Sequence, residues 1–150
     1  TIKLEKELQL KNQELATYVM NLVNKNQLVN NVIAKLDAQL DQFTPENRRY
    51  IISISSELSA SLNKEIWKEF EMRFNQVHPE FQNKILEKYP DLTPNELKLC
   101  SFLRMNMASK EISQITYQSV QSIEKARSRL RKKLELTNTE TTLVYFLSRF

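Results

Sequence analysis

The absence of glycine most strongly limits how this chain can fold. Its 150 residues include no glycine and only 4 prolines. Tight β-hairpins depend on glycine, because their two-residue turns need positive backbone φ angles. The composition, with 41% hydrophobic and 27% charged residues, is that of an ordinary protein that buries at least one core. We therefore expect an all-α fold in one or two small domains.

Apolar residues repeat every seven positions along the first part of the chain. One long helix is expected from Thr1 to about Gln42, with this row at intervals of seven: Leu8, Leu15, Leu22, Val29, Leu36 and Phe43. A strict seven-residue repeat predicts a left-handed coiled coil with another helix. We interpret the first five residues of the row as a dimer seam. The alternative is a single amphipathic helix that packs on its own domain.

A second long helix is expected to start at Thr44 and Pro45, because Thr is a good N-cap and Pro is favoured at the first helical position. Its apolar face continues to about Asn75: Ile51, Ile54, Leu58, Leu62, Ile66 and Phe70. Most of these steps are four residues long, which suits antiparallel packing in a bundle. Residues 1–78 are thus predicted to form a helical hairpin. In a dimer, two such hairpins would pack together as a four-helix bundle.

The positive charge of the chain gathers between Ser119 and Leu134. This segment has six Lys and Arg residues against one acid, Glu124, so its net charge is +5, whereas the whole chain carries +4. Such clustering on one element is typical of a helix that binds nucleic acid. Its apolar residues recur at spacings of three and four, which places them on one inward face: Ile123, Ala126, Leu130 and Leu134.

Another short helix is expected just before this basic segment. It covers residues 110–115, with Ile112 and Ile115 facing inward, and residues 116–119 form a tight turn. Ser119 is suited to cap the basic helix, because its side-chain oxygen can accept a hydrogen bond from an unpaired backbone N–H. A short helix, a tight turn and a basic helix with one apolar face predict a helix-turn-helix.

The second half of the chain carries a recognisable set of residues: Leu92, Thr93, Glu96, Ser109-Lys110-Glu111-Ile112, Ser119, Ser122-Ile123 and Lys133-Leu134. This set resembles the signature of LuxR/GerE-type DNA-binding domains. Residues 70–81 and 89–100 resemble a subgroup, the output region of membrane sensor-regulators with an outer β-propeller and a three-tyrosine domain. The resemblance implies a four-helix LuxR-type domain over residues 79–150, whose last helix carries Leu143, Val144, Phe146 and Leu147.

The resemblance also implies partners and a location. It implies double-stranded DNA as the ligand, a homodimer, and an upstream sensor region in the same polypeptide, as in two-component signalling. The chain would then be the cytoplasmic part of a longer, membrane-anchored protein. The sequence departs from the family at three positions of interest. Asn106 replaces a glycine between two helices, but Asn can also enter the left-handed region. Thr116 and Gln118 replace apolar turn residues, so the turn is either repacked or hydrogen-bonded through them.

The outward face of the basic helix supplies the expected DNA contacts. We predict base-edge contacts from Gln121, Ser122, Lys125, Ser128 and Arg129. We predict phosphate contacts from Lys110, Arg131, Lys132 and Lys133. The expected function is that of a sequence-specific transcriptional regulator. An upstream signal would change the spacing or register of the long helices, and so decide whether two recognition helices fit major grooves about 34 Å apart.

The alternative is a dimeric interaction module that recruits an acidic partner protein without binding DNA. Phosphotransfer through His78 is a weaker alternative. In the phosphoacceptor helix of histidine kinases an acidic residue directly follows the histidine, whereas here Pro79 follows His78. Cys100 is expected to be a small buried residue. One His and one Cys cannot build a metal site, and a chain without glycine has no glycine-rich phosphate loop. We therefore expect no enzyme activity, no metal or cofactor, and no small-molecule substrate.

Overall fold

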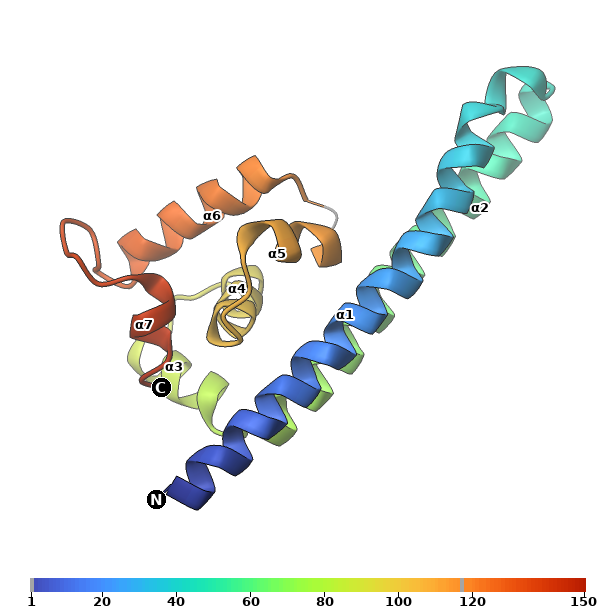
Figure 1. Ribbon diagram of the computed structural model, residues 1–150. Helices are drawn as coiled ribbons and strands as arrows, with labels where there is room; N and C mark the ends of the chain where they lie inside the picture. The colour runs from blue at the N-terminus through green and yellow to red at the C-terminus, as the bar shows by residue number, and fades with distance from the viewer. Residues whose placement is uncertain (1, 117) are drawn as a thin grey trace. The chain divides into compact units, whose positions relative to one another are not determined.

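The computed structural model describes residues 2–116 and 118–150, and within them it contains helices but no strand. The elements are α1 (Ile2–Ala38), the 3-10 helix η1 (Leu40–Gln42), α2 (Pro45–Val77), α3 (Phe81–Lys88), α4 (Pro94–Arg104), α5 (Ser109–Thr116), α6 (Val120–Lys133) and α7 (Leu143–Leu147) (Figure 1). The prediction of an all-α fold is therefore confirmed. None of the described helices combines the length and the apolar character needed to cross a membrane.

The chain divides into two compact units. One, here called the hairpin unit, is Gln13–Met72 and contains most of α1 and α2. The other, here called the α3–α7 unit, comprises Thr1–Asn12 together with Arg73–Phe150.

The hairpin unit consists of two antiparallel helices joined through η1 (Figure 1). α2 begins as predicted, since the Oγ1 of Thr44 accepts a hydrogen bond from the N–H of Asn47 at 3.2 Å. α1 ends earlier than expected, at Ala38, and the Nε of Arg48 donates to the carbonyl of Leu40 at 3.0 Å to hold the connection. The buried residues of the unit come from both helices: Leu15, Val19, Val23, Asn26, Ile33, Ser55, Ile66 and Phe70.

The row of residues predicted as a dimer seam runs along α1, with Leu8 in the α3–α7 unit and the other four residues in the hairpin unit. Leu15 is buried within a single chain. Leu22 and Val29 are half-buried, whereas Leu8 and Leu36 are each 42% exposed. One hairpin thus uses part of the row for its own packing and leaves the rest uncovered, and a dimer seam stays a prediction.

The α3–α7 unit packs short helices around one core, in which α6 contacts α4 and α5, and α7 contacts α4. The most deeply buried apolar residues come from every one of these helices and the end of α6: Phe81, Ile85, Leu103, Ile112, Ile123, Leu130, Leu134 and Leu147. Thr93 caps α4, since its Oγ1 accepts a hydrogen bond from the N–H of Glu96 at 3.2 Å. Thr142 caps α7 in the same way.

Two helices of this unit end in a left-handed residue although the chain lacks glycine. Asn106 after α4 and Glu135 after α6 both have a φ of 59°. The N–H groups of Asn106 and Met107 donate back into the last turn of α4, and those of Glu135 and Leu136 into the last turn of α6. Both ends are Schellman motifs. The left-handed conformation predicted for Asn106 is confirmed, whereas that of Glu135 was not expected.

Candidate nucleic-acid interface

The predicted DNA-contacting residues lie on α5 and α6: Lys110 on α5 and all the others on α6. α6 starts at the predicted cap, since the Oγ of Ser119 accepts a hydrogen bond from the N–H of Ser122 at 3.0 Å. Ile112 and Ile115 of α5 are buried, as expected from their spacing. Two short helices with a capped connection therefore form at the expected place. They are called the α5–α6 pair below.

Hydrogen bonds close the connection between α5 and α6. The Oγ1 of Thr116 donates to the carbonyl of Ile112 at 2.9 Å and accepts from the N–H of Gln118 at 3.4 Å. The Oγ of Ser113 donates to the carbonyl of Gln118 at 2.6 Å. The turn could have been repacked or hydrogen-bonded through polar side chains, and the structure shows the second. Tyr117, which the sequence also placed in the turn, lies outside the described residues.

The inner face of α6 holds the helix on the unit. Ile123, Leu130 and Leu134 are buried and Ala126 is half-buried, so the predicted apolar stripe is confirmed. At its flank, Nη1 of Arg127 donates to the Oγ of Ser109 on α5 at 3.3 Å. Arg127 follows Ile123 by four residues, and this helical spacing could have predicted that it points toward α5.

The outer face of α6 is polar and cationic. Among its exposed side chains, six polar or cationic ones are spaced so that they lie away from the apolar stripe: Gln121, Ser122, Lys125, Ser128, Arg129 and Lys132. The structure thus brings all five predicted base-contacting residues onto one exposed helix face. Glu124 is exposed as well and is the only acid on α6.

Arg131 is committed to contacts within its own chain. Its guanidinium donates to the carbonyls of Thr141 at 2.7 Å, Leu136 at 2.8 Å and Thr139 at 3.3 Å. These bonds fasten the segment between α6 and α7 to the last turn of α6. A phosphate contact from Arg131 would compete with them. Its place one residue after the buried Leu130, at the border of the apolar stripe, was the sequence signal for this inward role.

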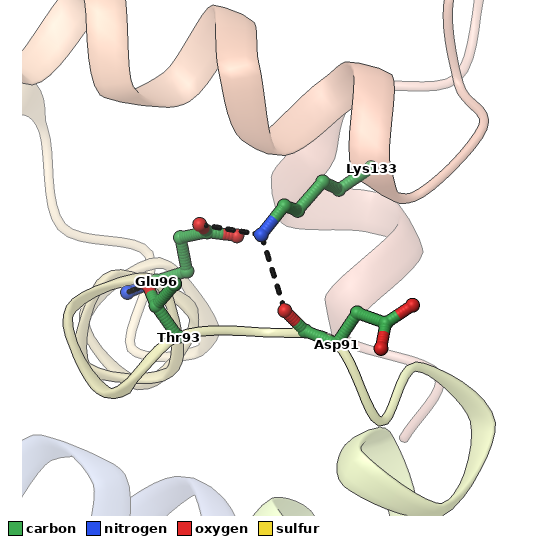
Figure 2. A network of polar contacts seen from close by, with 4 residues as sticks. All are labelled: Asp91, Thr93, Glu96 and Lys133. Carbon is green, nitrogen blue, oxygen red and sulfur yellow. Dashed lines mark hydrogen bonds and ion pairs between the residues drawn. The ribbon is translucent and has the colours of Figure 1, made fainter.

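Lys133 is also engaged within the chain. Figure 2 shows its side chain reaching from α6 to Glu96, whose Oε1 lies 2.8 Å from the Nζ, and to the carbonyl of Asp91 at 3.1 Å. The carboxylate of Glu96, in the first turn of α4, is thus the ion-pair partner of Lys133. Among the four predicted phosphate contacts, only Lys110 and Lys132 are exposed without a partner in the described chain.

His78 is enclosed in the α3–α7 unit and is 8% exposed. Its Nε2 lies 2.8 Å from the Oδ1 of Asn12, and its ring centroid is 5.1 Å from that of Phe74. Burial, and secondly the charge of Arg104, lower the pKa of His78 from 6.5 to about 4. An enclosed imidazole gives no support to phosphotransfer, because a phosphoryl donor must reach the ring nitrogen.

Cys100 is fully buried as expected, and burial, with the charge of Glu96 second, raises the pKa of its thiol to about 12. The part of the chain that the structure describes has no cluster of three or more His, Cys, Asp or Glu residues that could hold a metal ion.

The chain matches no protein-family model, no curated protein and no solved structure. The case for a function therefore rests on the α5–α6 pair, its exposed cations and the residues that carry the LuxR/GerE resemblance.

Proposed function

We propose that this chain is a sequence-specific DNA-binding transcriptional regulator, the output module of a signal-sensing protein, that binds as a homodimer with α6 in the major groove. The observation that carries the proposal is the exposed face of α6. It carries three cations together with Gln and Ser side chains, opposite a buried stripe that fixes the helix on its unit. The LuxR/GerE resemblance of the same residues supports the same reading.

The residue types on this face suit two tasks. Gln, Ser, Lys and Arg side chains can read base edges, which assigns Gln121, Ser122, Lys125, Ser128 and Arg129 to the groove floor. Lys110 and Lys132 are assigned to phosphates, because they are exposed at the periphery of the α5–α6 pair. Arg131 and Lys133 are assigned to holding α6 in place and not to phosphate contacts, since each already bonds groups of its own chain.

The proposal is tested by selecting binding sites from random duplex DNA with the purified chain, at about 150 mM salt so that non-specific phosphate binding is weak. Enrichment of an inverted repeat is the expected result, since it reports both sequence reading and a symmetric dimer. Enrichment of a single half-site would keep DNA reading and refute the dimer. No enrichment, with no DNA retained even at low salt, would refute the proposal and favour the acidic-partner alternative.

Two variants sharpen the selection. Lys125→Ala is expected to change which sequences are enriched, because it removes a base-edge contact from the outer face of α6. Lys64→Ala is the matched control, an exposed lysine of α2 in the hairpin unit, and is expected to enrich the same sequences as the unchanged chain. An unchanged selection with Lys125→Ala would remove this residue from the base-reading set.

A further inference from the structure

One side of the hairpin unit has a groove between its two helices. Leu22, Asn26 and Val29 of α1 line one wall, and Leu62 and Ile66 of α2 line the other. Both helices therefore contribute to this side of the hairpin.

The apolar lining continues beyond the groove toward η1. Val32 and Leu36 follow Val29 by three and seven residues, and Ile54 and Leu58 precede Leu62 by eight and four, so they share the same helix faces. These four side chains are 41–58% exposed. The hairpin thus presents one long apolar face that its own chain does not cover, and a contiguous face of this kind marks an interaction surface.

Asn26 is a polar residue at the floor of the groove. It is 2% exposed and lines the groove, and its Nδ2 is a buried donor without an acceptor in the described chain. Buried amide donors are nearly always satisfied in native structures. A single Asn in an apolar helical interface is a known means of fixing register between chains.

The charges at the groove indicate what covers it. Lys25 is on the α1 wall and Glu65 on the α2 wall, and both are exposed. In a second copy related by a two-fold axis parallel to the helices, α2 of that copy lies over α1 of the first at the same height. Lys25 of each copy then faces Glu65 of the other. A two-fold axis perpendicular to the helices would instead place α1 over α1 and α2 over α2, so that Lys25 would not face Glu65 of the other copy.

We propose that this face binds a second copy of the chain, forming a four-helix bundle whose two-fold axis runs along the helices and whose floor contains Asn26 from both copies. The inference deepens the homodimer of the proposed function and rests on it for its biological role. The bundle sets both copies of α2 to end on the same side, as two DNA-binding domains on one inverted repeat require. Its test needs no DNA.

The test is the mass of the full chain in solution by sedimentation equilibrium. The unchanged chain is expected to be a dimer, and Leu58→Glu to weaken dimerisation by about a hundredfold or more, because each dimer would bury two unpaired carboxylates. Ile52→Glu is the matched control: Ile52 is 44% exposed against 41% for Leu58, but lies on a different face of α2. It is expected to dimerise normally. Circular dichroism checks that each variant keeps its helix content.

The axis is tested by charge reversal. Lys25→Glu is expected to weaken the dimer about tenfold, and adding Glu65→Lys to restore it. A monomeric unchanged chain, or equal effects of Leu58→Glu and Ile52→Glu, would overturn the proposed face. Failure of the double reversal to restore affinity would overturn the axis. A chain that dimerises as expected but enriches no DNA sequence would refute the proposed function and leave this inference standing.

Discussion

Replacing Arg131 and Lys132 one at a time separates support of α6 from contact with DNA. Both are cations in the last turn of α6, and the change to Met removes one charge in each case. Arg131 bonds three backbone carbonyls of its own chain, at 2.7, 2.8 and 3.3 Å, whereas Lys132 is exposed. The first variant should therefore lose stability and the second DNA affinity.

The size of the stability loss follows from the contacts. Hydrogen bonds from a charged donor contribute about 1.5–3 kcal/mol each when well enclosed. Arg131 is half-buried, one of its bonds is long, and the released carbonyls can bond water, so we expect Arg131→Met to lose about 2 kcal/mol in total. For a domain of about 60–100 residues, this loss lowers Tm by about 8–16 °C. Lys132→Met should stay within about 0.5 kcal/mol of the unchanged chain.

The size of the DNA effect follows from counterion release. One lost phosphate contact reduces the slope of log K against log salt by about 0.9, which corresponds to about a fivefold loss of affinity at 0.15 M salt. Lys132→Met should show this loss on every DNA sequence. Arg131→Met, measured well below its Tm, should keep the slope of the unchanged chain.

The assays are thermal unfolding by circular dichroism and fluorescence-anisotropy titration of duplex DNA at several salt concentrations. An Arg131→Met chain with an unchanged Tm and a reduced salt slope would refute the reasoning, since it would make Arg131 a phosphate contact. A Lys132→Met chain with the full slope would remove Lys132 from the interface.

Three further results are expected. Cys100 should react with a thiol reagent at neutral pH at least about a hundredfold more slowly in the folded chain than in urea, because burial raises the pKa of its thiol to about 12; fast labelling of the folded chain would contradict this. Glu135→Gly should raise the free energy of unfolding by about 0.5–1 kcal/mol in a urea titration, because glycine adopts a φ of 59° without steric cost; a less stable variant would show that the Glu135 side chain contributes more than its backbone costs. The neutral imidazole of His78 is favoured in the folded state, where its pKa is lowered to about 4, so below pH 6.5 the unfolded chain binds a proton that the folded chain does not. The free energy of unfolding should therefore fall by about 3 kcal/mol at most as the pH is lowered from 6.5 to 4. Urea titrations at several pH values should show this loss in the unchanged chain and not in His78→Gln. Equal pH profiles for the two chains would show that His78 titrates normally.

Local signals in the sequence predicted local structure well. The N-caps at Thr44 and Ser119 are confirmed, because a cap depends on one side chain and the backbone within three residues of it. The inward stripe of α6 is confirmed for the same reason, since helix geometry alone fixes which residues share a face. The left-handed Asn106 also follows from the properties of one residue.

Side-chain contacts that depend on tertiary packing were not predicted. Arg131 and Lys133 belong to a cationic run, and composition alone assigned them to phosphates. Their observed partners are backbone carbonyls of a loop and the carboxylate of Glu96, which is 37 positions from Lys133. Which groups a long side chain reaches depends on tertiary packing, and helical spacing indicates only the side on which it lies.

The heptad pattern of α1 illustrates a different limit. An apolar stripe indicates that one face of a helix packs against another element, but that element can belong to the same chain or to another. Leu15 is covered by its own hairpin and Leu36 is not. The two residues have the same position in the repeat, so the sequence pattern could not distinguish them.

α6 is restrained at both ends before any ligand arrives. The Ser119 cap holds its beginning and the Arg127–Ser109 bond its middle, while Arg131 and Lys133 hold its end. A helix held in this way does not have to fold on DNA, so the conformational entropy lost on binding would come only from exposed side chains, about 0.5–1.5 kcal/mol for each one immobilised. The heat-capacity change of binding would then report the surface buried against DNA, without a contribution from folding of the recognition element.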